Sequence, residues 1–116
     1  MTVQDPKQLA RRIYAAYESE DRHAVEELIA DELTFYSPAD VGIDRAAYFA
    51  RCWPNSELIE SFELERLLDI GNGEVLVTYE STKHDGQRFR NTEILTFRDG
   101  KLTKAEVYFG WNLPRQ

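Results

Sequence analysis

The chain has 116 residues, 42% hydrophobic and 30% charged, which suits one soluble globular domain covering residues 1–116. Its formal net charge of −7 argues against nucleic acid or an anionic membrane as a partner, because both require a basic surface. The lone Cys52 excludes an intramolecular disulfide, and no apolar stretch is long enough for a signal peptide or a spanning helix, so we expect a cytoplasmic protein.

Two short helices are predicted at the start of the chain. Asp5-Pro6 is typical of a helix start, and an apolar stripe at helical spacing follows it: Leu9, Ile13 and Ala16, flanked by Tyr14 and Tyr17. Asp21 is the expected N-cap of a second helix, which buries Val25 and ends at residues 30–32. The short link between the two predicts a helical hairpin.

A strand, a loop and a third helix come next. Residues 33–37 alternate between apolar and polar, and Pro38 ends this strand. Residues 40–42 are interpreted as a loop. Asp44 is then the expected N-cap of a helix over residues 45–53, with its inward face made of Ala46, Phe49, Ala50 and Trp53.

From residue 56 the apolar period changes to two. The first long strand reaches Ile70 and is predicted to face the core with Leu58, Phe62, Leu64, Leu68 and Ile70. Turn signals at Asn72-Gly73, Asp85-Gly86 and Asp99-Gly100 separate three further strands, over residues 74–83, 87–97 and 101–111. A four-strand antiparallel meander behind three helices predicts an α+β domain, with a curved sheet wrapped round the helices and open at one end.

Glu93 is the residue that does not fit its predicted strand face, which it shares with Phe89, Leu95 and Phe97. We interpret this carboxyl group as the polar point of a pocket, where desolvation would raise its pKa and keep it protonated. The alternative interpretation pairs it with Arg88 or Arg90 at the rim of the sheet.

The register of the hairpin at Asp85-Gly86 decides what faces Glu93, and two registers are compatible with the sequence. A two-residue loop places Thr78 opposite Glu93 and Glu80 diagonally across from it. A three-residue bulged loop instead places Val77 or Tyr79 on the same face as Glu93, which gives the more apolar face.

The wall of the expected pocket is aromatic, with candidates Phe35, Trp53, Phe97, Phe109 and Trp111. Trp111 lies near the end of the chain, where a fully buried tryptophan is uncommon, so it is expected at the mouth. His23 and His84 are expected at the surface without a second ligand at metal-binding spacing, so we predict no metal. No phosphate-binding glycine loop is present, and we expect no cofactor.

Two segments carry a resemblance to a known family: ARRIYAAYESEDRHAVEELIADELTFYSP (residues 10–38) and FRDGKLTKAEVYFG (residues 97–110). With them the chain resembles the NTF2-like superfamily and, within it, the SnoaL-like and ketosteroid-isomerase-like proteins. The resemblance implies a cone-shaped fold, with three N-terminal helices packed on a curved, mostly antiparallel sheet. It also implies a small hydrophobic ligand or substrate, and a homodimer formed through the sheet.

The resemblance assigns three positions of a ketosteroid isomerase site. Tyr14 and Glu93 match the two groups of the oxyanion hole. The general-base aspartate of that family falls at Ser37, whose hydroxyl cannot take a proton at neutral pH. Asp40 is the substitute that could swing in, and Tyr17 is expected to contact the ligand beside Ser37.

Three functions remain open at this stage. The first is a cofactor-free isomerase, cyclase or dehydratase acting on a small hydrophobic carbonyl compound through Tyr14, Glu93 and Asp40. The second is a protein that binds an apolar ligand without chemistry, which the serine at position 37 favours. The third is an interaction protein that uses the mixed outer sheet face: Thr92, Ile94, Thr96, Lys104, Glu106 and Tyr108.

Overall fold

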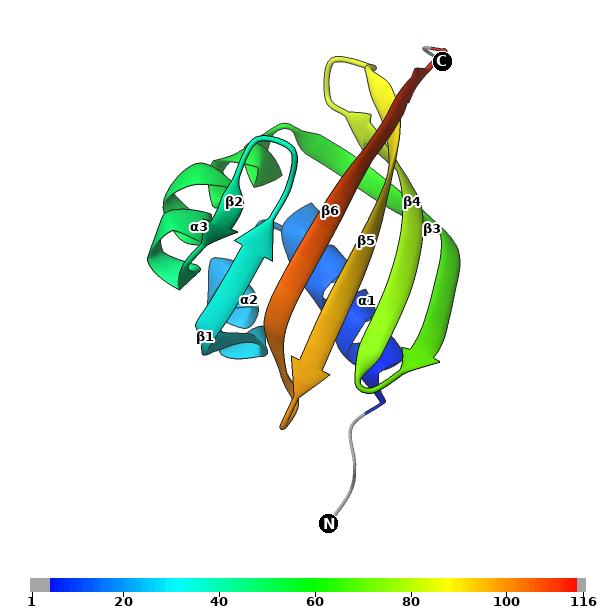
Figure 1. Cartoon of the computed structure of the whole chain (residues 1–116). Coiled ribbons are helices and arrows are strands. Elements are labelled where there is room, and N and C mark those ends of the chain that lie inside the picture. Colours follow the sequence, from blue (N-terminus) through cyan, green and yellow to red (C-terminus); the bar gives the residue numbers. More distant parts are fainter. Residues whose placement is uncertain (1–4, 115–116) are drawn as a thin grey trace.

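The computed structural model describes residues 5–114 and shows helices covering one face of a curved sheet (Figure 1). The helices are α1 (Pro6–Glu18), α2 (Arg22–Leu28), α3 (Arg45–Arg51) and the 3-10 helix η1 (Trp53–Glu57). The strands are β1 (Ile29–Tyr36), β2 (Val41–Ile43), β3 (Ile59–Gly71), β4 (Glu74–Lys83), β5 (Arg88–Arg98) and β6 (Lys101–Leu113). The predicted α+β architecture is confirmed.

The six strands lie in the order β2-β1-β6-β5-β4-β3. Only β1 and β6 are parallel, and the four long strands form the predicted antiparallel meander. The helix α1 packs against β3 and β4, and α3 packs against β1. The sheet is not closed into a barrel, so an open space is left between its concave face and the helices.

Each of the three α-helices begins at an aspartate that accepts a backbone hydrogen bond. Asp5 accepts from Lys7 N (3.0 Å), Asp21 from Ala24 N (3.1 Å) and Asp44 from Ala47 N (2.9 Å). Such caps satisfy amides that have no partner within the helix, and each is worth about 1 kcal/mol. No helix within residues 5–114 has both the length and the apolar character needed to cross a bilayer.

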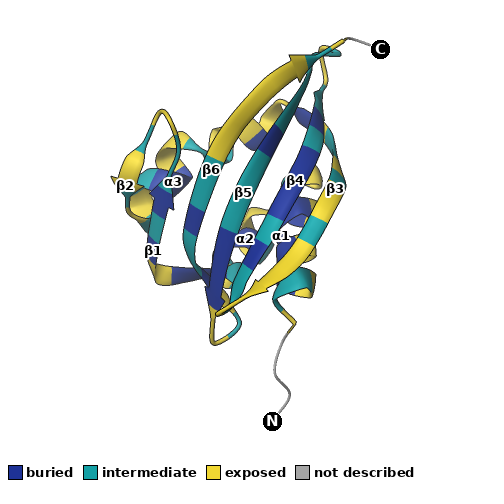
Figure 2. Cartoon of the chain, turned by 45° about the vertical axis from the view of Figure 1, so that its right-hand side comes forward, coloured by how far each residue is buried: buried dark blue, intermediate teal, exposed yellow. Residues whose placement is uncertain are grey.

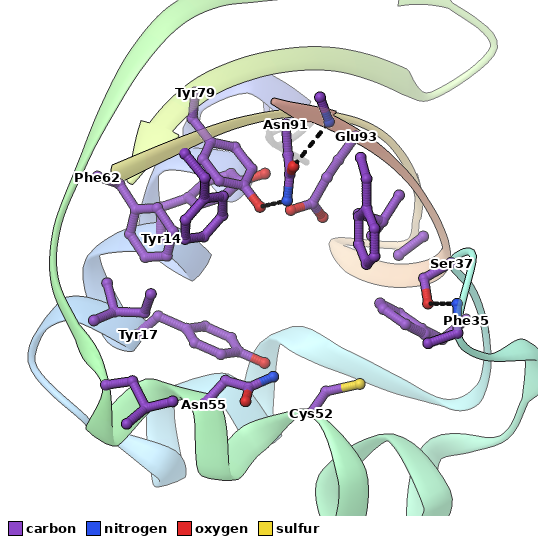
Figure 3. Close-up of a pocket in the computed structure, with 18 of the residues that line it drawn as sticks. Tyr14, Tyr17, Phe35, Ser37, Cys52, Asn55, Phe62, Tyr79, Asn91 and Glu93 are labelled. Atoms are coloured by element: carbon purple, nitrogen blue, oxygen red, sulfur yellow. Dashed lines mark hydrogen bonds between the residues drawn. The ribbon is translucent and has the colours of Figure 1, made fainter. Parts of the chain in front are cut away.

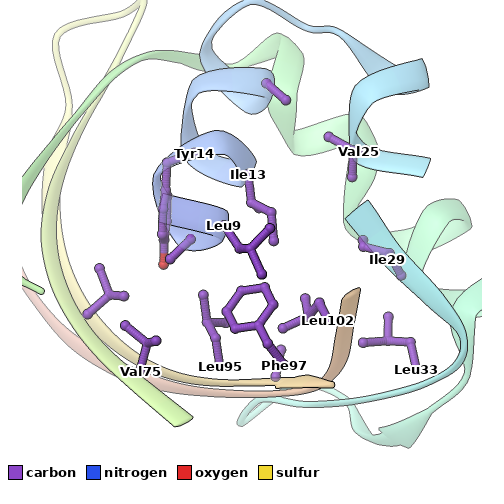
Figure 4. Packing of buried hydrophobic residues seen from close by; sticks show 14 of the residues in the cluster. Leu9, Ile13, Tyr14, Val25, Ile29, Leu33, Val75, Leu95, Phe97 and Leu102 are labelled. Carbon is purple, nitrogen blue, oxygen red and sulfur yellow. The ribbon is translucent and has the colours of Figure 1, made fainter. Parts of the chain in front are cut away.

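The core lies where α1 crosses the sheet. Leu9 is 1% exposed and packs with Ile13 above the inward residues of the sheet, which include Val75, Leu95, Phe97 and Leu102 (Figure 4). Buried residues alternate with less buried ones along much of β4, whereas the buried residues of β5 gather at residues 95–97, as Figure 2 shows. The core fills this end of the molecule and leaves the other end for the pocket.

Three predicted element boundaries and the inward face of one helix were wrong. The first strand begins at Ile29 rather than residue 33, because residues 29–36 pair with β6. Residues 41–43 form the short strand β2 instead of a loop. The third helix ends at Arg51 and gives way to η1 before Pro54. Its inward face is also rotated, because Tyr48 and Phe49 are buried while Ala46 and Ala50 are exposed.

The predicted inward face of β3 was wrong at both ends of the strand. The pairing with β4 shifts between Leu64 and Arg66, so this strand carries a bulge. A bulge turns every later side chain to the opposite face. Leu67 therefore points inward, and Leu68 and Ile70 are about half exposed on the outer face (52% and 46%). Leu58 precedes the strand and is also exposed (52%).

The β4–β5 hairpin adopts the second of the two registers that the sequence allowed. Its loop has three residues, His84 to Gly86, with Gly86 at φ 88° and Gly86 N donating to Lys83 O (2.9 Å). Val77 therefore lies opposite Glu93, and Tyr79 opposite Asn91. Thr78 faces the other way, towards Thr92. Glu93 thus shares its face with valine and tyrosine side chains and not with Glu80.

Candidate functional site

A pocket of about 570 Å³ lies between the concave face of the sheet and the helices α1, α3 and η1 (Figure 3). This volume is within the range of small-molecule sites. Its middle is apolar, with side chains from α1, β1, β5 and β6: Ile13, Phe35, Leu95, Leu102, Ala105 and Val107. Its mouth carries exposed apolar side chains, chiefly Leu58, Phe109 and Trp111.

Glu93 lines this pocket from the middle of β5. Its neighbours across the sheet are Val77 on β4 and Val107 on β6, and Leu95 follows it on the same face. Burial raises the pKa of Glu93 from 4.5 to about 7, although the hydroxyl groups of Tyr79 and Tyr14 lower it in part. Both the acid and the carboxylate are therefore populated near neutral pH, as a proton-transfer group requires.

Two tyrosine hydroxyls accompany Glu93. The rings of Tyr14, Tyr79 and Phe62 form a cluster with centroid separations of 5.2 to 5.3 Å, which holds both tyrosines in place. Burial, and next the charge of Glu93, raise the pKa of Tyr14 and of Tyr79, so both phenols stay protonated as donors. Within residues 5–114, Tyr14 Oη is buried and makes no hydrogen bond of good geometry, although it lies close enough to Glu93 to lower the pKa of that carboxyl group, so it is available to a ligand beside Glu93.

Asn91 organises the same corner of the pocket. Its Nδ2 donates to Tyr79 Oη (3.3 Å), and its Oδ1 accepts from Gly110 N on β6 (3.2 Å) (Figure 3). Because Tyr79 Oη accepts from Asn91, its own hydrogen is left for another acceptor, and the Tyr79 hydroxyl lowers the pKa of the Glu93 carboxyl group. Gly110 allows this close approach, since a Cβ there would lie 2.1 Å from Arg90 O.

The alternative pairing of Glu93 with an arginine is not what the structure shows. Arg90 donates to Glu80 Oε1 (2.8 Å) and to Glu65 Oε2 (3.1 Å), and Arg88 lies 3.6 Å from Glu80. These residues occupy the opposite face of the sheet from Glu93. The arginines therefore do not neutralise the carboxyl group in the pocket.

Ser37 and Asp40 line the pocket from the turn after β1, although neither is free. Ser37 Oγ accepts from Ala39 N (3.2 Å) and Asp40 N (3.1 Å), so the hydroxyl organises the turn. Asp40 Oδ1 lies 2.5 Å from Arg51 Nε on α3. Its carboxylate is thus engaged in an ion pair at the edge of the pocket.

The predicted wall residues divide into two groups. Tyr17 and Phe35 line the pocket, and so do Phe109 and Trp111, which are 59% and 63% exposed at its mouth. Trp53 and Phe97 do not line it, and here the prediction was wrong. Trp53 packs against the Tyr17 ring (5.0 Å) from behind, and Phe97 is part of the core at the closed end of the sheet.

Several pocket residues were missed by reasoning from the sequence. Tyr79 and Asn91 share the inward face with Glu93 only in the observed register, so they could be assigned only once the loop length was known. Tyr48, Cys52 and Asn55 line the pocket from α3 and η1. They were missed because the spacing of Ala46 and Ala50 suggested that these alanines face inward, whereas α3 is rotated and turns Tyr48 inward instead.

Comparison with known proteins agrees with the architecture. Residues 10–105 match the model of the SnoaL-like domain family. None of the curated proteins matches the sequence.

Solved structures with similar folds come from several bacteria. An NTF2-like protein from Cytophaga hutchinsonii has 19% identity and a TM-score of 0.75, with 95% of each chain covered. A candidate ketosteroid isomerase from Kribbella flavida has 18% identity and a TM-score of 0.77, covering 96% of this chain and 82% of that one. A candidate polyketide cyclase from Sinorhizobium meliloti has 16% identity and a TM-score of 0.72, covering 86% and 93%.

The raised pKa of Glu93 predicts an unusual pH dependence of stability. The unfolded chain ionises this group near 4.5, whereas the folded chain does so near 7, so deprotonation favours unfolding over that interval. As the pH rises from 5 to 8, the unfolding free energy of the unmodified protein should fall by about 2 kcal/mol relative to that of Glu93→Gln, because the glutamine has no proton to lose. Denaturant titrations at a series of pH values measure this difference.

The control for that measurement is Glu57→Gln, which removes one negative charge from an exposed position. A difference for Glu93→Gln that does not depend on pH, or that matches the control, would contradict the buried environment of Glu93.

Proposed function

The chain belongs to the SnoaL-like domain family, and from this premise and the pocket around Glu93 we propose that it is a cofactor-free enzyme of the isomerase, cyclase or dehydratase type. Its substrate is a small hydrophobic carbonyl compound. The observation that carries the proposal is one carboxyl group with a pKa of about 7, accompanied by the buried hydroxyl of Tyr14, in a pocket whose middle is apolar.

Proton transfer at the α-carbon of a ketone is the step that this group suits. The ionised Glu93 takes the proton, the C–H electron pair forms a carbon–carbon double bond, and the carbonyl oxygen gains the negative charge. Where the ketone carries a β,γ double bond, protonated Glu93 returns the proton to the γ-carbon, the carbon–carbon double bond moves to the α,β position and the carbonyl re-forms, so the isomerisation needs no other reactant. A group whose pKa lies near the working pH performs both halves of this cycle.

Tyr14 is the proposed donor to the developing oxyanion. Its hydroxyl is protonated and buried, and it makes no hydrogen bond of good geometry among the described residues. A donor already in place within a water-poor site stabilises the transition state by several kcal/mol. Tyr79 would assist by stabilising the ionised state of Glu93 between cycles.

Asp40 is proposed as the second proton carrier for reactions that move a proton over a longer distance. It lines the pocket, although it must first leave Arg51. This engagement, together with the serine at position 37, favours the alternative function, in which the protein binds an apolar ligand and releases it unchanged.

A homodimer formed through the sheet is proposed as the working assembly. The outer face of the sheet carries apolar side chains that the described part of the chain leaves partly or about half exposed: Leu68, Ile70, Leu76, Ile94 and Tyr108. Leu68, Leu76 and Ile94 stand side by side on adjacent strands. Exposed apolar groups of this extent are typical of a contact surface.

The enzyme proposal predicts exchange of α-protons with solvent. A panel of fused-ring ketones and enones is incubated with the protein in D₂O, and deuterium incorporation is followed by NMR. We expect Glu93→Gln to slow exchange by about 100-fold or more, since its side chain cannot accept the proton. Tyr14→Phe should slow it by about 10- to 100-fold while ligand affinity changes less.

Tyr108→Phe is the matched control, because this hydroxyl lies on the outer face and bonds Glu106. If a ketone binds but is recovered without deuterium, the protein is a binder and not an enzyme. Equal losses of affinity and exchange rate in both variants would also contradict the proposed chemistry.

The dimer proposal is tested by the mass of the protein in solution. Analytical ultracentrifugation should give about twice the chain mass of 13.5 kDa, and Leu68→Glu should convert it to the monomer. Val41→Glu is the control, because Val41 is 80% exposed on β2, away from the outer face. A monomeric unmodified protein would rule the proposal out.

A further inference from the structure

The pocket has a second polar end, opposite Glu93. Tyr17 of α1, Tyr48 and Cys52 of the α3 segment, and Asn55 of η1 all line it, and we refer to these four residues as the opposite cluster. Figure 3 shows Tyr17, Cys52 and Asn55 facing Glu93, Asn91 and Tyr79 across open space. None of the four has a part in the chemistry proposed above.

The opposite cluster holds a hydrogen-bond donor that the protein does not use. The hydroxyls of Tyr17 and Tyr48 form a hydrogen bond with each other, in which one of the two hydroxyls donates its hydrogen and the other accepts it. Within residues 5–114 neither hydroxyl has another hydrogen-bonding partner, so the second hydrogen is left without an acceptor. Tyr48 is buried at 6% exposure, and a buried hydrogen-bond donor without an acceptor is unfavourable.

The surrounding rings hold the two tyrosines in this position. Tyr17 packs on Trp53 (5.0 Å between ring centroids), while Tyr48 packs on Phe35 (5.2 Å) and Phe49 (5.4 Å). A donor supported by three aromatic contacts does not turn easily towards solvent. The unused hydrogen is therefore presented to whatever occupies the pocket.

The opposite cluster is electrically neutral at pH 7. Burial raises the pKa of both tyrosines and raises that of Cys52 to about 11, so all three stay protonated. Arg51, the neighbour of Cys52 in the chain, is already paired with Asp40. This end therefore suits an uncharged oxygen, a hydroxyl or a carbonyl, and not a carboxylate or an ammonium group.

We infer that the ligand carries two oxygen functions at opposite ends of a hydrocarbon frame. One oxygen, the carbonyl at the Glu93 end, accepts from Tyr14, and the other accepts from the Tyr17–Tyr48 pair. The apolar middle of the pocket contacts the frame between them. This inference rests on the proposed function for the first oxygen and adds the second as the determinant of substrate choice.

The test compares rigid ligands that differ by one hydroxyl group. The probes are 2-naphthol against 2,6-dihydroxynaphthalene, and 4-phenylphenol against 4,4′-dihydroxybiphenyl, with dissociation constants measured by calorimetry. In at least one pair the two-oxygen compound should bind about tenfold more tightly, as one additional hydrogen bond allows. The double variant Tyr17→Phe, Tyr48→Phe should abolish that difference and leave the affinity for the one-oxygen compound within about twofold.

Tyr108→Phe is the control, and it should keep the full preference. Comparison of the ligands on the unmodified protein does not depend on the folding of any variant. Equal affinities within both pairs would overturn the second contact while leaving the Glu93 site intact. A preference that persists in the double variant would overturn the assignment to these tyrosines. If no phenol binds at all, the small-molecule function itself fails, and the inference with it.

Discussion

The burial of one carboxyl group is the constraint on which the site depends. Glu93 lies between Val77 and Val107 on a sheet face that is otherwise apolar or aromatic. An ionised carboxylate is unfavourable in such surroundings unless donors compensate it. The hydroxyls of Tyr79 and Tyr14 compensate only in part, which leaves the pKa near 7 instead of returning it to 4.5. The pocket thus holds a group that changes charge at neutral pH.

This environment depends on a turn at the far end of the β4–β5 hairpin. The three-residue loop ending at Gly86 selects the register that places Tyr79, Asn91 and Glu93 on one face. A register one residue different would place Thr78 opposite Glu93 and bring Glu80 onto the same face. The same register sends Arg90 to the outer face, where it pairs with Glu80 and Glu65. The length of the β4–β5 loop therefore keeps the carboxyl group of Glu93 on the opposite face of the sheet from Arg90.

The sequence predicted the order of elements and the position of Glu93, because caps, turns and alternation are local signals. It could not decide the hairpin register, since a two-residue and a three-residue loop at Asp85-Gly86 were equally compatible with it. The bulge in β3 has no local signal either, so Leu68 and Ile70 were assigned to the wrong face. Tyr48 was missed because the rotation of α3 depends on tertiary packing, in which Tyr48 contacts Phe35 of β1.

Titration of Glu93 itself tests the central claim most directly. With ¹³C-labelled glutamate, the Glu93 side-chain carboxyl resonance is assigned by its loss in Glu93→Gln and followed from pH 3 to pH 9. The pocket described above predicts a midpoint near 7, shifted higher in Tyr79→Phe as a compensating donor is removed. A midpoint near 4.5, the ordinary value for a glutamate in water, would contradict the account.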